Sequence, residues 1–187
     1  MKLWGGRFSQ DSAKSAQALS RSVHFDYRLA KYDIAVNLNH VLTLEQTSII
    51  SKADSKKLQD ALKKIGDEVN SQKFEILESD EDIHSAIERR LVELLPDIGS
   101  VIRTGRSRND LVATDFKLYL LESFHHIAVN ICALINVINE QALSQVKTIA
   151  PGFTHTQHAQ PISFGQELSK HSEALTRDLT RINDWLT

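Results

Sequence analysis

The stretch Thr104-Gly105-Arg106-Ser107-Arg108-Asn109-Asp110 opens a long segment, residues 106–150, that contains neither glycine nor proline. Apolar residues recur along this segment at intervals of three and four. They are Phe116, Leu120, Phe124, Ile127, Ile131, Leu134, Ile138 and Ala142. Because residues three and four apart share one helix face, the spacing predicts a single α-helix, roughly 50–60 Å long at 1.5 Å per residue. Asn109 or Asp110 is expected to cap its first turn.

The residues just before this helix have the chemistry of an anion-binding site. Gly105 permits backbone dihedrals that other residues avoid, and Arg103, Arg106 and Arg108 are close to the helix start. A helix start offers free N–H groups and the positive end of the dipole, and forked guanidinium groups beside it can hold a carboxylate or a phosphate. A capped helix with solvated arginines is the alternative that these residues leave open.

The other apolar stripes predict four further helices, at about residues 26–44, 53–70, 83–95 and 163–187. Asp26 is expected to cap the first of them, and the acidic run Ser79-Asp80-Glu81-Asp82 to cap the third. Residues 151–161 contain two prolines and no helical stripe, so a non-helical connection is expected there. A short connection implies that the long helices on either side of it pack antiparallel, as in a bundle.

The composition is that of an ordinary soluble protein. Hydrophobic residues make up 41% of the chain and charged residues 25%, which is enough apolar material for a core. The net charge of −2 argues against nucleic acid or an anionic membrane as the main partner. The longest purely apolar runs are only a few residues, so no membrane-spanning helix is expected. The single cysteine, Cys132, excludes an internal disulfide and suits a reducing cytoplasm, and Met1–Gln10 has no apolar run of a signal peptide.

Two histidine-containing stretches are candidates for chemistry. Thr154-His155-Thr156-Gln157-His158 lies on the irregular connection, and a histidine there can give or take a proton near neutral pH. The alternatives are a hydrogen-bonded loop histidine, or a metal site of His155 and His158, for which the neighbouring sequence supplies too few ligands. His84 and Glu88 are four residues apart and could pair on a helix face. Taken alone, His84 is interpreted as a helix-surface histidine.

Three separate motifs carry a family resemblance. They are K-L-W-G-G-R-F at Lys2–Phe8, T-G-R-S-R-N-D at Thr104–Asp110, and G-F-T-H-T-Q-H-A-Q-P at Gly152–Pro161. In this order they resemble the argininosuccinate lyase family of the fumarase/aspartase superfamily. The resemblance runs over essentially all 187 residues. Members of that family are more than twice as long, so the chain resembles their amino-terminal part.

The resemblance implies a reversible β-elimination in arginine biosynthesis, in which argininosuccinate gives arginine and fumarate. Negative charge accumulates on a carboxylate during this reaction, and Arg106, Ser107 and the helix N–H groups suit its stabilisation. A proton must also be removed on one side and supplied on the other. By the resemblance, His155 is the catalytic general acid or base.

The same resemblance assigns substrate contacts. Ser22, Asn109 and Thr154 match positions that the family uses to bind substrate. The helix that contains D-I-H-S-A-I-E, residues 82–88, lines the active cleft in the family, which makes His84 a candidate cleft residue. The amino-terminal arm, with Trp4 and Phe8, is expected to be an ordered extended segment.

The sequence also departs from the family pattern. Val36-Asn37 stands where the family usually has Gly-Ser, Arg103 where it usually has histidine, and Leu111 where it usually has glutamine. The family's catalytic serine lies on a G-S-S-x-M-P-x-K-x-N-P loop that does not occur in these 187 residues. We therefore expect the chain by itself to be inactive.

Together these observations predict an all-α protein. A small N-terminal helical domain, residues 1–109, would precede the first helices of a long-helix bundle, residues 110–187. The resemblance implies a homotetramer acting on a small molecule, with no cofactor or metal and no nucleic-acid or membrane partner. Two alternatives stay open: another lyase of the superfamily, such as adenylosuccinate lyase, or a non-catalytic structural homologue like the lens crystallins of this family.

Overall fold

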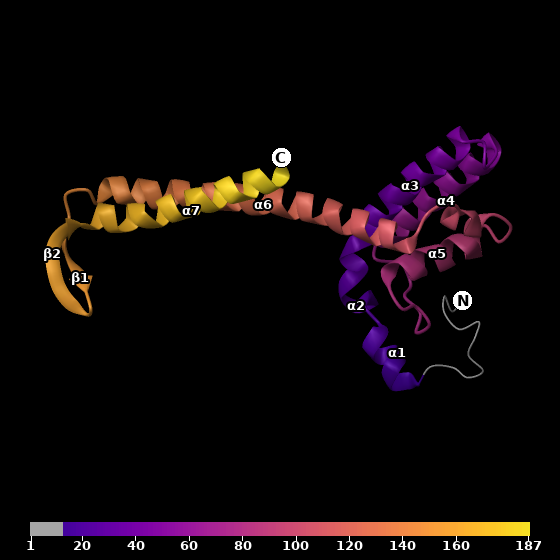
Figure 1. Ribbon diagram of the computed structural model, residues 1–187, viewed down its shortest axis with the longest axis horizontal. Coiled ribbons are helices and arrows are strands. Elements are labelled where there is room, and N and C mark those ends of the chain that lie inside the picture. The colour runs from indigo at the N-terminus through magenta and orange to yellow at the C-terminus, as the bar shows by residue number, and fades with distance from the viewer. Residues whose placement is uncertain (1–12) are drawn as a thin grey trace. The chain divides into compact units, whose positions relative to one another are not determined.

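The computed structural model describes residues 13–187 (Figure 1). The amino-terminal motif at residues 2–8, and with it the expected arm, lies outside the described residues. The chain divides into two compact units, Met1–Tyr119 and Leu120–Thr187.

The regular elements in the described part of the first unit are all helices or 3₁₀ turns, joined by irregular connections. Its elements are α1 Lys14–Ser20, α2 Val23–Asp26, the 3₁₀ turn η1 Tyr27–Leu29, α3 Ala30–Gln46, α4 Lys52–Asn70, α5 Ile83–Leu94, the 3₁₀ turn η2 Gly99–Arg103, and the start of α6 Arg108–Ser144. Helices α3, α4 and α5 lie side by side (Figure 1) and enclose the core. The largest fully buried apolar side chains come from all three helices; they are Val41, Leu58, Leu62, Ile65, Ile83, Ile87 and Leu91. Each contributes about 1.5–3 kcal/mol through burial.

The helix starts follow local sequence signals. Ser51 caps α4 by accepting a hydrogen bond from the Asp54 N–H. Asp82 caps α5, and Ser85 returns the bond through its hydroxyl oxygen, which accepts from the Asp82 N–H. The acidic cap predicted for this helix is thereby confirmed, with Asp82 as the capping residue.

The predicted role of Asp26 was wrong. Helix α3 begins only at Ala30, after the turn η1, and has no side-chain cap. Asp26 instead serves a different helix, because its Oδ1 accepts a 3.0 Å bond from the Ile83 N–H at the first position of α5. The hydroxyl of Ser22 donates to its Oδ2 at 2.6 Å. The sequence could not show this because the two helix starts are 57 residues apart.

Helix α6 begins at Arg108, before either predicted cap, Asn109 or Asp110. The Ser107 hydroxyl accepts from the Asn109 N–H at 3.2 Å, and the Asp110 carboxylate accepts from the Ser107 N–H at 3.1 Å. Ser107 is therefore the capping residue, and the prediction of Asn109 or Asp110 was wrong. Gly105 has the expected unusual backbone, with φ of 68°. The helix has 37 residues, about 55 Å at 1.5 Å per residue.

The second unit consists of residues 120–144 of α6, the strands β1 Ile149–Thr154 and β2 Gln157–Ser163, and α7 Phe164–Leu186. Ser163, near which this last helix was predicted to start, caps α7 by accepting a bond from the Gln166 N–H. Helix α7 runs back along α6 (Figure 1), and Gly165 lets their backbones approach closely, since an added Cβ would lie 2.4 Å from the Ala142 carbonyl oxygen. The rings of Phe124 and Trp185 meet at 4.6 Å between centroids.

This helix pair leaves much apolar surface uncovered. Large side chains of α6 that stay exposed in this unit are Ile127, Val129, Leu134, Val137 and Leu143. Two helices cannot bury all their apolar faces against each other, as a bundle of more helices can.

Helix α6 also meets the length and composition criteria for a membrane span. Its most apolar 18-residue window has a mean hydropathy of 1.5, although the apolar runs within it are short. A central helix of a bundle has the same composition.

The connection at residues 149–163 is non-helical as predicted, but it forms an antiparallel hairpin that the sequence did not indicate. Thr154 pairs with Gln157, so His155 and Thr156 form the two-residue turn. Both have positive φ, 49° and 62°, as such a turn requires. The fold class is all-α with this one small hairpin, which confirms the class predicted from the sequence.

Two glycines of the first unit give a matched test of its packing. At Gly99 an added Cβ would lie 2.8 Å from the Val92 Cα and 2.9 Å from the Leu91 carbonyl oxygen, whereas at Gly66 it would meet only the Ile34 side chain at 3.9 Å. We expect Gly99→Ala to lower the free energy of unfolding by about 1–3 kcal/mol through overpacking. Gly66→Ala, inside α4, should raise it by about 0.5–1 kcal/mol. Urea unfolding followed by circular dichroism measures both, and equal effects would contradict this packing.

Candidate active site

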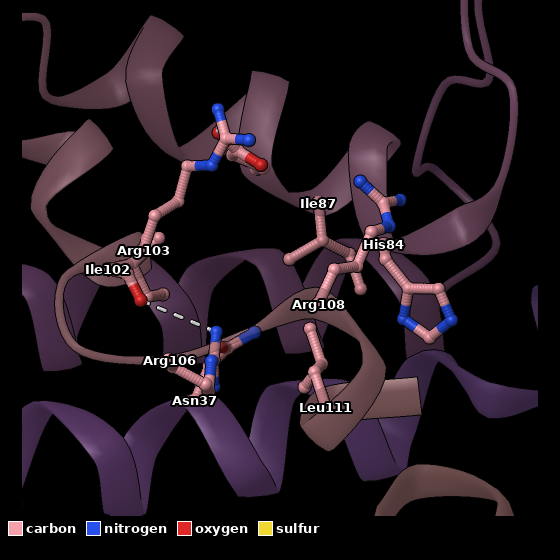
Figure 2. A pocket seen from close by; sticks show the side chains of 9 residues that line it. Asn37, His84, Ile87, Ile102, Arg103, Arg106, Arg108 and Leu111 are labelled. Carbon is pink, nitrogen blue, oxygen red and sulfur yellow. Dashed lines mark hydrogen bonds and ion pairs between the residues drawn. The ribbon is translucent and has the colours of Figure 1, made fainter. Parts of the chain in front are cut away.

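A cavity of about 310 Å³ lies where α3, α5, η2 and the start of α6 meet. Its lining combines cationic, polar and apolar side chains; they are Asn37, His84, Ile87, Glu88, Ile102, Arg103, Arg106, Arg108 and Leu111. Figure 2 shows the three arginines arranged around this space. The sequence therefore places all three guanidinium groups of the stretch 103–108 at one cavity.

Two of the three arginines have carboxylate partners. Arg103 lies 3.4 Å from a carboxylate oxygen of Glu88. Arg108 forms a hydrogen-bonded ion pair with Asp82, the residue that caps α5. Their charges are therefore partly compensated within the protein, and the Arg108 pair ties the start of α6 to the start of α5.

Arg106 differs from both neighbours. Its Nη2 donates to the Asn37 side-chain oxygen at 2.6 Å and to the Ile102 carbonyl at 3.4 Å. Its Nη1 is buried and has no hydrogen-bond partner among residues 13–187. None of the ion pairs in this part of the chain includes Arg106. A buried guanidinium nitrogen without a partner is costly, and an anion in the cavity would satisfy it.

A buried cluster of two carboxylates and one imidazole adjoins the cavity. The Nδ1 of His84, on α5, lies 2.7 Å from Asp33 Oδ2 on α3 and 3.4 Å from Asp115 Oδ2 on α6. Asp33 and Asp115 are both 0% exposed, and His84 is 6% exposed. Neither oxygen of Asp115 accepts a hydrogen bond from the described residues, so its attraction to His84 is mainly electrostatic.

This cluster has the residue types of a metal site, and its candidate ligand atoms lie within 4.8 Å of one another. Ligands around a tetrahedral ion at about 2.0–2.1 Å are about 3.3 Å apart. The distance of 2.7 Å between His84 Nδ1 and Asp33 Oδ2 is shorter than this ligand separation and is that of a hydrogen bond. The geometry is therefore that of a buried ion pair.

Burial and mutual attraction set the pKa values of the cluster. Burial alone would lower the pKa of His84, but the contacts with Asp115 and Asp33 outweigh it and raise that pKa to about 9. Burial raises the pKa of Asp33 to about 6, against the opposing effect of His84. Burial likewise raises the pKa of Asp115. At pH 7 His84 is therefore a cation and Asp33 an anion.

The interpretation of His84 as a surface histidine was wrong. Its ring is buried against Asp33, and its expected partner Glu88 pairs with Arg103 instead. A histidine that follows a capping residue on a helix gives no local sign of burial. The signal for the burial of His84 was on two other helices, where Asp33 and Asp115 fall on apolar stripes. Charged residues rarely occupy such positions without a partner.

The other predicted site residues of the first unit gather near the helix starts. Ser22 donates its N–H to the Glu81 carbonyl at 2.8 Å, just before α5. Ser107 caps α6, and Asn109 is exposed in its first turn. Sequence reasoning did not select Asp33 or Asp115 as site residues.

Thr154 and His155 belong to the second unit. Thr154 ends β1, and His155 is the first residue of the exposed hairpin turn. His158 pairs with Phe153 across the strands, with 4.9 Å between ring centroids. The turn fixes the backbone at His155 while leaving its side chain open to solvent.

Comparison with known proteins identifies the family. A lyase family model, Lyase_1, matches residues 6–187. The chain belongs to this lyase family. It is 45% identical to the argininosuccinate lyase of Nitrosomonas europaea over 183 residues and 43% identical to that of Frankia casuarinae over 185 residues. These matches cover 98% and 99% of the chain but only 40% of each relative, so the chain spans about two fifths of their length. The resemblance to argininosuccinate lyases is thereby confirmed.

Solved structures of lyases share the fold of this family member. An EDDS lyase in complex with formate matches 94% of the chain with a TM-score of 0.71 at 18% identity. A fumarate lyase:delta crystallin from Brucella melitensis matches 88% of it with a TM-score of 0.71 at 19% identity. At such low identity the likeness shows the fold alone. Asn37, Arg103 and Leu111, which the resemblance led us to interpret as departures from the family pattern, all line the cavity formed by the three arginines, called the arginine cavity from here on.

The buried cluster predicts a pH-dependent stability. The folded state raises the pKa of His84 from 6.5 to about 9, so the folded protein binds more protons than the unfolded chain between these values. The free energy of unfolding should therefore decrease as the pH rises from 6.5 to 9, by on the order of 1–3 kcal/mol. Urea unfolding across this range measures it.

Two variants check the assignment of this pH dependence to His84. His84→Asn, which keeps an N–H donor but cannot titrate, should flatten the profile. His24→Asn, at an exposed histidine of the same unit, should leave it unchanged. A flat profile for the unmodified chain would contradict the buried ion pair.

Proposed function

We propose that this lyase family member acts in the β-elimination of argininosuccinate to arginine and fumarate. The observation that carries this proposal is the cavity at the start of α6, where Arg106 presents a buried guanidinium nitrogen without a partner. The similarity to argininosuccinate lyases along 98–99% of the chain supports the choice of substrate. The longer relatives carry segments that this chain does not span, so the activity is proposed for the complete enzyme.

The elimination breaks two bonds on adjacent carbons of the succinate moiety. A base takes a proton from the carbon beside one carboxylate, and that carboxylate becomes more negative. The electron pair then forms the double bond of fumarate, and the C–N bond breaks. The leaving nitrogen keeps the bonding electrons and accepts a proton, which gives arginine.

The first unit supplies groups that suit the accumulating charge. Arg106 would bind the carboxylate, since charge-assisted hydrogen bonds from a guanidinium are strong and directional. Ser107 and Asn109 lie in the first turn of α6, where the helix dipole favours an anion. His84 lies in the first turn of α5, and Ser22, just before α2, donates its N–H to the Glu81 carbonyl next to that turn. We propose Ser22 as a substrate contact and His84 as a group that shapes the cavity wall.

His155 is proposed as one of the two proton-transfer groups, with Thr154 as a substrate contact. The two-residue turn holds the His155 backbone at a φ of 49°, and the residue is exposed. A histidine can transfer a proton near neutral pH. The second group is proposed to be the serine of the family's G-S-S-x-M-P loop, which is not in these 187 residues.

The apolar faces of α6 and α7 support association. We propose that they pack against further helices in a homotetramer of the complete enzyme, because exposed apolar area of this extent marks an interaction surface. The cytoplasm is the proposed location, which fits the single cysteine.

Substitution of His155 tests the proton-transfer role in the complete enzyme. His155→Asn should lower kcat by roughly 10²–10⁴-fold with little change in substrate binding. Asparagine is also favoured at the first turn position with positive φ, so the hairpin should be kept. The matched control is His158→Asn, which should stay within about tenfold. Fumarate formation from argininosuccinate measures the rate, and an unchanged kcat for His155→Asn would refute the assignment.

The 187-residue chain itself provides a second test. Without the serine loop, we expect it to form fumarate at least 10²-fold more slowly than a complete argininosuccinate lyase, because a catalytic proton-transfer group is missing. The assay is the same fumarate measurement, repeated with adenylosuccinate, the substrate of the alternative lyase, in place of argininosuccinate. Turnover close to that of a complete enzyme would show that the catalytic set assigned above is wrong.

A further inference from the structure

A continuous chain of polar contacts leads from the buried cluster to the arginine cavity. Asp33 bonds His84 through Oδ2 and accepts a 2.5 Å bond from the Asn37 side-chain nitrogen through Oδ1. The Asn37 side-chain oxygen in turn accepts the 2.6 Å bond from Arg106. Asn37 is 3% exposed, and Asp33 is 0% exposed. The side chain of Asn37 is therefore the only link in this contact chain between the buried ion pair and the cavity arginine.

The chemistry of the partners fixes how the Asn37 amide is oriented. A guanidinium only donates hydrogen bonds, so it must face the amide oxygen. An ionised carboxylate only accepts, so Asp33 must face the amide nitrogen. With both ends engaged and the residue buried, the amide cannot rotate without losing two bonds to charged groups, each stronger than a neutral bond.

Asn37 also holds Arg106 without neutralising it. Arg103 and Arg108 are each bound by a carboxylate, Glu88 and Asp82. Arg106 is held by a neutral amide and a backbone carbonyl. Asp33 and Asp115 attract it electrostatically, but no described carboxylate forms an ion pair with it, so no direct carboxylate contact competes with a ligand. Among residues 13–187 the Nη1 of Arg106 has no hydrogen-bond partner, so this donor is left for a ligand.

We propose that Asn37 is a positioning residue, which fixes the Arg106 guanidinium in the cavity and keeps its charge available to a carboxylate ligand. The proposal rests on the proposed function, in which Arg106 binds a carboxylate of the substrate. Asn37 acts through Arg106 and does not itself touch the ligand. Its loss should therefore weaken the binding of carboxylates only as long as Arg106 is present.

A double-mutant cycle on the 187-residue chain tests this dependence. The probe is fumarate, with the neutral diamide fumaramide as the control ligand, and the dissociation constant is measured by isothermal titration calorimetry. Arg106→Ala should raise the constant for fumarate by about 10–100-fold. Asn37→Ala should raise it by about five- to tenfold, and the double variant should be no weaker than Arg106→Ala alone.

Two further variants separate positioning from a general loss of structure. Asn37→Ser introduces a hydroxyl that can still donate to Asp33 but is too short to reach Arg106. It should therefore weaken fumarate binding as Asn37→Ala does, and it replaces Asn37→Ala in the test if that variant folds poorly. Asn39→Ala, at an exposed asparagine of the same helix whose side chain donates to the Ala35 carbonyl, should bind like the unmodified chain. Circular dichroism confirms folding in each case.

The outcomes distinguish this inference from the function on which it rests. Fumarate binding that is absent, or unaffected by Arg106→Ala, would refute the carboxylate-binding role of Arg106 and the present inference with it. A weakened Arg106→Ala variant, together with Asn37 effects that are absent or simply add, would overturn the positioning role alone. Non-additive effects of the two substitutions, confined to fumarate, support it.

Discussion

The first unit depends on the ion pair between His84 and Asp33, because it places charge in the core and joins separate helices. Asp33 lies on α3, His84 on α5, and Asp115, the second carboxylate near the imidazole, on α6. Removing one partner of a buried pair typically costs about 3–5 kcal/mol, since the other charge is left without compensation. The pair therefore restricts these three helices to arrangements in which the groups meet.

That restriction determines where the arginines can lie. The stretch from Arg103 to Arg108 is short and joins η2 to α6, so fixing Asp115 against His84 also fixes the loop before it. Arg108 reaches Asp82 at the α5 cap, and Arg106 reaches Asn37, one turn along α3 from Asp33. The starts of α5 and α6 are therefore held together by buried charges, and the three guanidinium groups around the cavity follow from this arrangement. No dedicated binding loop is needed.

The sequence predicted those features that local interactions determine. The apolar stripes of α4, α5 and α7 were recognised, and so was the acidic cap of α5, because a cap and its helix lie within four residues of each other. Asp26, His84 and Asn37 were misjudged or left without a role because their partners are about 50 to 70 residues away. The hairpin was missed because His155 and Thr156 lack the glycine that usually marks a turn with positive φ. The site motifs were found through resemblance, but the contacts that hold them needed the fold.

The two parts of the proposed chemistry have opposite physical requirements, which the two units reflect. Holding a carboxylate benefits from burial, since a guanidinium in a low-dielectric site interacts more strongly than one in water. The first unit meets this requirement within its own core. A proton-transfer histidine must instead reach a substrate, and His155 stands on an exposed turn with strained backbone at both of its residues. Strain of about 1–3 kcal/mol per residue persists only where the surroundings enforce it, and here the paired strands do so. An exposed imidazole becomes effective only once water is excluded around it, so under the proposed mechanism the cover for this turn must come from segments outside the second unit.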